Sequence, residues 1–472
     1  MSHHPHQHSA SRRRLLAGAL GLGGLAALAP LRLARAADFK ALVCVFLYGG
    51  NDGMNTVVPM DAGRYADYAK VRAGLALPQA SLGRLGTSDF GLHPALAALN
   101  PLFAAGKLAV QFNVGPLYAP LTKAQYHADA GQTALTPPSL FSHSDQQVLW
   151  ESASTDAQSR TGWGGRSAVA LGLASPVVSV GGNGHFGLSE LVAPLVLPGP
   201  GEGFGAAGLG AADIGWKPNA LKLDAVKALA AQAADTDLAG AFQKQQQAAM
   251  ALADQLGPLI QRRPGDAGSN AAIDTAFAPL IANGNVTTGL GQQLYQTAKL
   301  LDVRATLGGT RQIYFAQLGG FDTHGGQAGA NVLAGTHAAL LKQLGDALAC
   351  FQAALTALGL ADSVTTFTQS DFGRTFLPNN SGGTDHAWGN HHLVFGGAVK
   401  GGLYGAYPTL ALGGPDDVGV DSWEQQGRWI PTSSVDQYAA TLLGWMGASD
   451  SQLNSVLPNL PNFGSARNLG FV

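Results

Sequence analysis

Two stretches of sequence decide the fold: RQIYFAQLGGFDTHGGQ, residues 311–327, and VTTFTQSDFGRTFLPNNSGGTDHAWGNHHLVFGGAVKGGLYG, residues 364–405. Each stretch opens on an apolar run typical of a β-strand, at 312–317 and 364–368, and each run ends in a turn rich in Gly, Asp and His. Between them, leucines recur every three or four residues from 333 to 355, which predicts a helix with one apolar face. We expect strand, helix, strand, with polar side chains at the carboxyl edge of the sheet, where open α/β sheets bind ligands.

Further apolar runs extend the predicted sheet. Residues 41–48, ALVCVFLY, and 107–114, KLAVQFNV, are long and continuous enough for strands that are buried on both faces. Residues 176–180 and 409–414 predict two shorter strands, and residues 435–446 predict a helix near the end of the chain. We therefore expect the α/β class, with a large mixed, mostly parallel sheet sandwiched by helices.

Residues 1–36 predict a twin-arginine signal peptide that is removed on export. Residues 11–16, SRRRLL, match the twin-arginine motif, an apolar run of Gly, Ala and Leu follows, and residues 34–36, ARA, form a small-residue cleavage pattern. The apolar run is shorter than the roughly 20 residues that cross a bilayer. We expect a periplasmic or secreted protein that meets the twin-arginine export machinery and has no stable membrane span after cleavage.

Residues 37–472 are expected to form a single domain with a helical insertion. From 186 to 307 the sequence changes to loops of Gly, Ala and Pro and then to stretches rich in Ala, Gln and Leu, which predicts an insertion or a cap over the site. The charges nearly cancel, with 28 Lys and Arg against 30 Asp and Glu, and this balance argues against a nucleic-acid partner. Two cysteines are too few for a disulfide framework and predict buried free thiols.

Acidic and imidazole side chains follow several of these apolar runs. They are Asp52 after the first run, Asp322 and His324 after 312–317, Asp371 after 364–368, and Asp385, His386, His391 and His392 after a later loop rich in Gly and Asn. Carboxylates and imidazoles without a thiolate suit a divalent ion, and this set leaves zinc, manganese, magnesium and calcium open. We expect one or two ions at this edge of the sheet.

Three further residues have more than one interpretation. Ser142 precedes a predicted helix, where its hydroxyl could cap the helix with Asp145 as the capping-box partner, or could act as a nucleophile beside the helix N-terminus. Arg166 and Arg374 lie in turns flanked by glycine, and each either clamps an anion with its planar guanidinium or forms a surface ion pair. The residues alone leave these choices open.

Several motifs carry a resemblance to a known family. They are GGNDGMN at 49–55, SHSDQQVLWE at 142–151, TGWGGR at 161–166, GGFDTHGGQ at 319–327, SDFGRT at 370–375 and GGTDHAWGNHHLVFGGAVKGGLYG at 382–405. Together they look like the exported bacterial family of domain of unknown function 1501, over most of residues 40–410. That family is similar to the alkaline phosphatase and sulfatase superfamily, whose fold is a large mixed sheet between helices with a metal site at the strand ends.

The resemblance implies roles for the residues that match the superfamily pattern. Its metal ligands would fall on Asp52, Asp322, His324, Asp371 and His386 or His391, and its nucleophile on Ser142. Phe372 departs from the pattern, because it stands where the superfamily has a ligand histidine and its side chain cannot bind a metal. One of two metal positions is then empty, or is rebuilt with Asp385 or His392.

These expectations predict an exported metal-dependent hydrolase of phosphate or sulfate esters, in which the ion activates Ser142 and Arg166 or Arg374 holds the anionic ester. The alternative, which Phe372 favours, is a non-catalytic exported protein of the same fold that binds a polysaccharide or a protein partner. A hydrolase with a Ser-His-Asp triad is disfavoured, because no Gly-x-Ser-x-Gly motif occurs.

Overall fold

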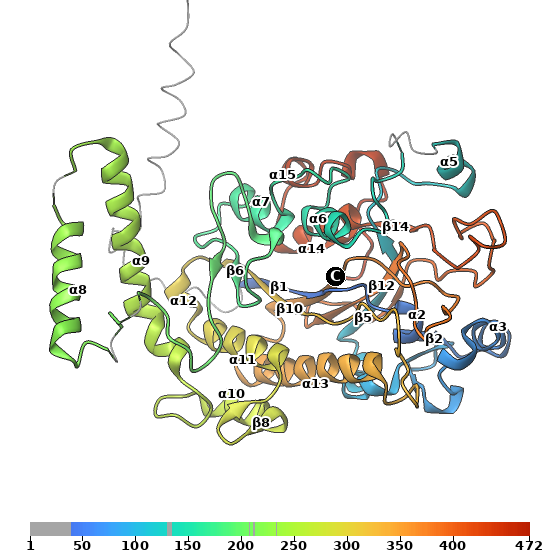
Figure 1. The fold of residues 1–472 in the computed structure, drawn as a ribbon, viewed down its shortest axis with the longest axis horizontal. Helices are drawn as coiled ribbons and strands as arrows, with labels where there is room; N and C mark the ends of the chain where they lie inside the picture. The colour runs from blue at the N-terminus through green and yellow to red at the C-terminus, as the bar shows by residue number, and fades with distance from the viewer. Residues whose placement is uncertain (1–38, 130–134, 207, 211–212, 233) are drawn as a thin grey trace, which may run out of the picture. The chain divides into compact units, whose positions relative to one another are not determined.

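The computed structural model describes residues 39–129, 135–206, 208–210, 213–232 and 234–472 (Figure 1). The predicted export signal at 1–36 lies outside the described residues. The described residues divide into two compact units, one containing Gly203–Pro258 and the other containing residues 39–202 together with Leu259–Val472.

The larger unit is built on a nine-stranded sheet. Its strands, in sheet order, are β13 (Gly402–Tyr404), β5 (Leu108–Gly115), β12 (Asn390–Gly396), β11 (Val364–Ser370), β1 (Lys40–Leu47), β10 (Arg311–Leu318), β6 (Val178–Ser179) and β7 (Leu195–Val196), and β14 (Ser433–Ser434) pairs with β5. β1 runs parallel to both β10 and β11, whereas β12 is antiparallel to β11 and to β5. The predicted α/β class with a large mixed, mostly parallel sheet is confirmed.

Helices cover both faces of this sheet (Figure 1). One layer contains α10 (Ala271–Ala276), α11 (Gly289–Asp302) and α13 (Thr336–Ala357), and the other contains α6 (His143–Ser152), α7 (Trp163–Ala170), α14 (Val435–Met446) and α15 (Asp450–Val456). Successive side chains of a strand point to opposite faces, so β1 packs against both layers. Leu42, Cys44 and Phe46 of β1 join Tyr438 and Leu442 of α14 in one buried apolar cluster. Burial on both sides explains why β1 is a continuous apolar run.

The remaining elements of the larger unit are short. A three-stranded sheet contains β2 (Val57–Pro59), β4 (Phe90–Leu92) and β3 (Gly83–Arg84), and a hairpin contains β8 (Ile281–Ala282) and β9 (Asn285–Val286). The short α-helices are α2 (Gly53–Thr56), α3 (Ala62–Arg72), α4 (Asn100–Ala104), α5 (Lys123–Ala128) and α12 (Arg304–Leu307), and the 3₁₀ turns are η2 (Ala73–Leu75), η3 (Gln79–Ser81), η4 (Pro94–Leu99), η5 (His185–Gly187), η6 (Ala278–Leu280) and η7 (Leu460–Phe463). Cys44 and Cys350 are buried free thiols, as predicted.

One predicted strand is wrong, and one strand was not predicted. Residues 409–414 form a turn, because Leu410 has φ 64° and Gly413 has φ 73°, and the Asp416 carboxylate binds the backbone N–H and the hydroxyl of Thr409. His391 and His392, which follow the Gly/Asn-rich loop, lie within β12, a strand that the sequence did not predict, and both imidazoles are buried. A strand that carries two adjacent imidazoles does not show the apolar pattern on which strand prediction depends.

The smaller unit contains α8 (Lys217–Ala230) and the first part of α9 (Asp237–Gln261), which lie side by side (Figure 1). The Gln247 side chain of α9 donates to the Ala230 carbonyl oxygen at 2.6 Å and so links the two helices. The single domain with an insertion at 186–307 stays a prediction, although α10 and α11 belong to the larger unit and α11 packs on β10. Among the described residues, no helix is both long and apolar enough to cross a membrane.

Candidate metal centre

The carboxyl ends of β1, β10 and β11 meet at one edge of the sheet, as parallel neighbours must. The Phe321 N–H, just after β10, donates to the Tyr48 carbonyl oxygen at 3.1 Å, and the Gly49 N–H donates to the Asp371 carboxylate at 3.1 Å. Gly49 has φ 110°, and a Cβ atom there would lie 2.3 Å from the Asp322 backbone nitrogen. A glycine is therefore required for the three strand ends to approach so closely.

Helix α6 adds one face of side chains to this edge. His143, Gln147 and Glu151 are spaced four residues apart and so lie along one side of the helix. His143 and Gln147 bind the Asp371 carboxylate at 2.7 and 2.9 Å, and Glu151 accepts from the Tyr48 hydroxyl at 2.7 Å. These contacts seat the first turn of α6 directly against the strand ends.

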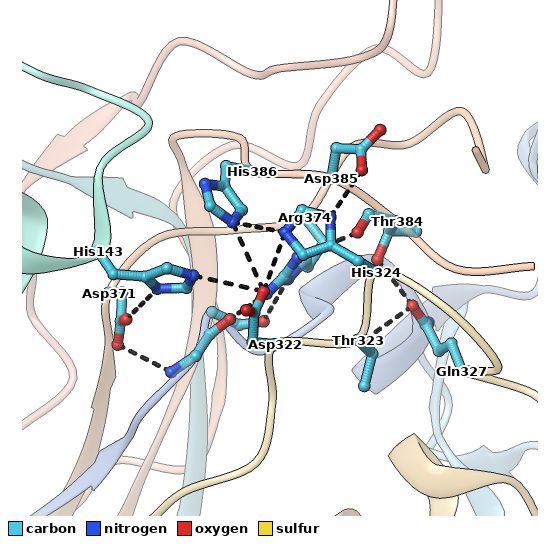
Figure 2. A network of polar contacts seen from close by, with 12 residues as sticks. His143, Asp322, Thr323, His324, Gln327, Asp371, Arg374, Thr384, Asp385 and His386 are labelled. Carbon is cyan, nitrogen blue, oxygen red and sulfur yellow. Dashed lines mark hydrogen bonds and ion pairs between the residues drawn. The ribbon is translucent and has the colours of Figure 1, made fainter. Parts of the chain in front are cut away.

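Three imidazoles converge on one carboxylate oxygen, Asp322 Oδ1 (Figure 2). The Nε2 atoms of His324, His143 and His386 lie 3.1, 3.3 and 3.5 Å from it. The His324 and His386 Nε2 atoms are 2.8 Å apart. In a tetrahedral site with metal–ligand bonds of about 2.0–2.1 Å, neighbouring ligand atoms lie about 3.3 Å apart. The three distances to Asp322 Oδ1 agree with this spacing, whereas the separation between His324 and His386 is shorter. His143, Asp322 and His386 each place a ligand atom within 4.8 Å of those of the other two.

The other ring nitrogen of each imidazole is held by an acceptor. His143 Nδ1 binds Asp371 Oδ2 at 2.7 Å, His324 Nδ1 binds Asp385 Oδ1 at 2.8 Å, and His386 Nδ1 binds the Phe141 carbonyl oxygen at 2.6 Å. A carbonyl or an ionised carboxylate only accepts, so each Nδ1 carries the proton. Every Nε2 then turns an unprotonated lone pair toward the others, which is how histidine ligands are oriented in metal sites.

This arrangement needs a cation or an extra proton at its centre. Two neutral Nε2 atoms cannot hydrogen-bond to each other, yet those of His324 and His386 are in contact. His143 Nε2 is buried and makes no hydrogen bond. The hydrogen bond to Asp371 raises the pKa of His143, so one way to fill the centre is to protonate this ring. A divalent ion satisfies all three nitrogens at once, and the donor set therefore fits a metal.

The centre remains open to solvent on one side. The Asp322, His324 and His143 side chains are 47%, 45% and 29% exposed. Catalytic metal sites keep such an open position for water or substrate, whereas structural sites are closed. Three imidazoles and one carboxylate suit zinc among the four ions that the sequence left open, because magnesium and calcium prefer oxygen ligands.

Arg374 holds Asp322 in place, and hydrogen bonds within the chain occupy four of its five N–H donors. Its guanidinium is buried, donates to the carbonyl oxygens of Gly50 at 2.9 Å and Thr384 at 3.0 Å, and also binds the Gly49 carbonyl oxygen and Asp322 Oδ1. Although burial favours the neutral acid, the hydrogen bond from Arg374 holds the pKa of Asp322 below its usual value. The expected role of Arg374 as an anion clamp is therefore not supported.

Phe372 forms an apolar wall of the centre. Its buried ring lies 4.6 Å from the His386 ring and 4.8 Å from the His143 ring, measured between centroids. It supplies no ligand atom, and neither of the expected replacements rebuilds a second position beside it. Asp385 instead orients His324, and His392 is buried against Trp150. The surroundings of Phe372 favour one ion.

Asp52 lies outside the converging ligands. Its carboxylate forms a fully buried ion pair with Arg72 and accepts from Gln327 Nε2 at 2.5 Å. Although burial favours the neutral acid, the charge of Arg72 holds the pKa of Asp52 below its usual value. Gln327 in turn accepts from the Thr323 and Thr384 hydroxyls (Figure 2), so Asp52 supports the loops behind the centre. The implied role of a metal ligand does not fit these partners.

His391 and Asp371 also differ from their expected roles as ligands. His391 accepts from the Asn113 N–H at 3.1 Å and packs 4.8 Å from the Tyr407 ring, and burial lowers its pKa to about 3. Asp371 is buried, and its carboxylate oxygens accept hydrogen bonds from Gly49, His143 and Gln147. The structure thus brings together Asp322, His324 and His386 as expected, with Asp371 behind His143.

Ser142 has neither of its two expected contacts. It occupies the N-cap position of α6, yet its hydroxyl makes no capping hydrogen bond and instead lies 3.1 Å from the Ser144 hydroxyl. No hydrogen bond joins it to any side chain of the centre in the described part of the chain. Nothing in these contacts activates the hydroxyl.

We expect Ser142→Ala to change the free energy of unfolding by less than about 0.5 kcal/mol and to leave metal content and turnover largely unchanged. A matched control is Ser434→Ala, since the Ser434 hydroxyl does cap α14, accepting from the Gln437 N–H at 3.0 Å, and its loss should cost about 1 kcal/mol. Urea unfolding measures both changes. Complete loss of turnover with metal retained would restore Ser142 as the nucleophile.

Arg166 packs beside the C-terminal part of α6 and has no partner in the centre. Its guanidinium donates to the carbonyl oxygens of Thr161, Ser152 and Val456, and its charge acts on Asp436. These contacts tie α7 to α6 and α15. The expected anion clamp at Arg166 is therefore not supported.

The same region predicts a pH dependence of stability. Burial raises the pKa of Asp436 to about 7, above its value in the unfolded chain, so the folded protein binds this proton more tightly. Ionisation of Asp436 then destabilises the fold increasingly from about pH 4 to pH 7, by up to about 1.4 kcal/mol per pH unit.

Asp436→Asn, which keeps an acceptor for the Asn459 N–H, should therefore stabilise the protein more at pH 8 than at pH 4.5. Unfolding curves at the two pH values measure the difference, with Asp450→Asn at an exposed carboxylate as the control. An equal effect at both pH values would contradict the raised pKa.

Sequence reasoning missed His143, the residue that completes the centre. Its partner Asp371 is 228 residues away in the chain, and no local pattern reveals that contact. A signal was nevertheless present, because His143, Gln147 and Glu151 recur at four-residue steps and give the predicted helix a polar face that points inward.

Comparison with known proteins identifies a family. A family model described as "Protein of unknown function (DUF1501)" matches residues 39–418. No curated protein matches the chain. Among solved structures, it is similar to the crystal structure of Ps i-CgsB in complex with k-i-k-neocarrahexaose, at 11% sequence identity and a TM-score of 0.33, covering 88% of this chain and 73% of that one. That likeness is too distant to bear on function.

Proposed function

We propose a function for this chain, which belongs to the DUF1501 family: an exported hydrolase of phosphate or sulfate esters that depends on one divalent metal ion. One observation carries the proposal. The Nε2 atoms of His324, His143 and His386 lie 3.1, 3.3 and 3.5 Å from Asp322 Oδ1, on a side of the centre that is open to solvent. An open site of this kind suits catalysis better than a structural role.

Each residue of the centre would have a separate role. His143, His324, His386 and Asp322 would hold the ion, which when bound supplies a Lewis acid and a water molecule of lowered pKa. Asp371, Asp385 and the Phe141 carbonyl oxygen fix the imidazole tautomers. Arg374 fixes Asp322, and Phe372 keeps water from the imidazole faces that it covers.

Zinc is the ion that we propose. Imidazole nitrogen is a good ligand for zinc, whereas magnesium and calcium select carboxylate, carbonyl and water oxygens. The four ligand atoms include only one carboxylate. Because Asp52 and Asp371 have other partners, no further carboxylate of the predicted set stands ready to convert the centre into an oxygen-rich site.

Metal analysis and hydrolysis assays test the proposal together. Purified protein should contain about one zinc ion per chain, a chelator should abolish hydrolysis of aryl phosphate or aryl sulfate esters, and added zinc should restore it. A chain without bound metal, or hydrolysis that survives chelation, would remove the proposal. Metal binding without hydrolysis of either ester class would favour the non-catalytic alternative, which binds a polysaccharide or a protein partner.

Export by the twin-arginine route is part of the proposal and rests on residues 11–16. The export receptor reads the arginine pair itself and not its charge alone. Replacing Arg12 and Arg13 with lysine should therefore leave the protein in the cytoplasm, as measured by fractionation and immunoblotting. An unchanged periplasmic yield would contradict this route.

A further inference from the structure

Arg428 is an arginine beside the centre whose terminal nitrogens have no partner within the described residues. The two arginines expected to bind an anion, Arg166 and Arg374, are occupied by carbonyl oxygens and by Asp322. We propose that Arg428 binds the tetrahedral oxyanion group of the ester, phosphate or sulfate, at the metal centre. This inference rests on the proposed function and assigns its anion-binding residue.

The position of Arg428 is tied to a candidate ligand. Its Nε donates to the His386 carbonyl oxygen at 3.0 Å, and its guanidinium lies 4.8 Å from the centroid of the Phe141 ring. Phe141 is also the residue whose carbonyl oxygen orients the His386 ring. One short chain of contacts thus links the guanidinium, the aromatic ring that it covers and the imidazole that faces the ion.

The terminal nitrogens of Arg428 are free to act. Only Nε is used by a hydrogen bond, and no carboxylate lies within ion-pair distance of the guanidinium among the described residues. The carboxylates of Asp385, Asp417 and Glu424 act on it electrostatically. Asp385 Oδ1 is committed to His324 and to Asn379 at 2.8 and 2.9 Å. The charge is therefore half-buried next to the centre without a direct partner.

The loop that carries Arg428 is rigidly anchored. The Asp417 carboxylate is buried and accepts from the backbone N–H groups of Gly413 at 2.9 Å, Gly427 at 3.1 Å and Arg428 at 3.1 Å. The Val418 N–H donates to the Arg428 carbonyl oxygen at 3.1 Å. A guanidinium on a fixed backbone, with its plane set by Phe141, loses little freedom when it binds a ligand.

The two terminal nitrogens of Arg428 suit a tetrahedral oxyanion. With Nε fixed, the two terminal nitrogens can still donate to two oxygens of a phosphate or sulfate group in the planar fork that arginine provides. A lysine at this position would supply charge without the fork. The remaining oxygens of the group would face the imidazoles and the open side of Asp322, so the guanidinium and the centre would recognise one group from two sides.

Binding of inorganic phosphate and of inorganic sulfate to the zinc-loaded protein, measured by calorimetry, tests the proposal without turnover. Arg428→Gln should weaken the anion that the wild-type protein binds by about tenfold to a hundredfold, because a hydrogen-bonded charge is lost. Arg428→Lys should retain part of the affinity. Arg84→Gln is the control, since Arg84 has the same charge and its guanidinium hydrogen-bonds, within the described residues, only to the Ser88 carbonyl oxygen.

Zinc content and melting temperature are measured on each variant. If Arg428→Gln binds less zinc or melts at a lower temperature than the wild-type protein, Arg428→Lys replaces it in the comparison. Hydrolysis should show a raised KM with a smaller change in kcat. Undiminished binding of both anions with zinc retained overturns the assignment of Arg428 and leaves the proposed function standing. A wild-type protein that holds no zinc overturns the proposed function instead.

Discussion

Replacing Asp52 with alanine is expected to lower the free energy of unfolding by about 3–5 kcal/mol, one of the largest effects of a single substitution in this protein. The change would leave the guanidinium of Arg72 buried without a counter-charge, since both side chains of this ion pair are 0% exposed. It would also remove the acceptor for Gln327, whose other contacts support Thr323 and Thr384. Urea unfolding at neutral pH, with zinc present, measures the loss.

Two controls separate the buried charge from other effects. The double variant Asp52→Leu with Arg72→Met removes both charges and should recover much of the lost stability. Asp346→Ala breaks the exposed ion pair with Lys342 and should cost only about 0.3–0.5 kcal/mol. If Asp52→Ala instead lost zinc while its unfolding free energy stayed the same, Asp52 would be a metal ligand after all.

Removing one imidazole of the centre should have the largest effect on metal affinity. We expect His143→Ala and His386→Ala each to weaken zinc binding by more than a hundredfold, since each removes a ligand atom from the converging set. Asp371→Asn should weaken it by about 10–100-fold, because it disturbs the acceptor that fixes the His143 tautomer. Competition with a coloured chelator measures all three affinities.

The control for these variants is His127→Ala, which removes an exposed imidazole on α5. Its zinc affinity should equal that of the wild-type protein. Melting curves are needed for Asp371→Asn, because Asp371 also accepts from Gly49 and Gln147. Unchanged affinity in His143→Ala would show that the helix contributes no ligand, and the centre would then reduce to Asp322, His324 and His386.

The sequence predicts the sheet well because its central strands are buried on both faces. β1 appears as a continuous apolar run, and β10 and β11 appear as short runs rich in β-branched and aromatic residues. Their parallel arrangement explains why Asp322, His324 and Asp371 were expected at one edge. The sequence does not predict β12, because its imidazoles interrupt the apolar pattern of a strand. Their burial depends on partners from distant segments, such as Trp150 and Tyr407.

The chemistry of the candidate site is harder to predict than its location. Asp52, Asp371 and Asp322 all follow strands and look alike in sequence, but a buried arginine from α3 neutralises the first, two side chains of α6 occupy the second, and only the third faces solvent. Arg374 and Arg428 differ in the same way, because all three nitrogens of Arg374 donate to neighbouring oxygens, whereas within the described residues only Nε of Arg428 does so. Such distinctions depend on contacts between residues that are far apart in the chain.

Gly49 limits how this site can change during evolution. Any other residue there would need a left-handed backbone conformation and would also strike the Asp322 backbone, so two independent barriers oppose each substitution. Replacing a ligand side chain requires no such backbone conformation, although replacing Asp322 would remove a partner of the buried Arg374. Substitution can therefore change the donor atoms of the centre, whereas the close approach of the chain after β1 to the chain after β10 requires glycine at position 49.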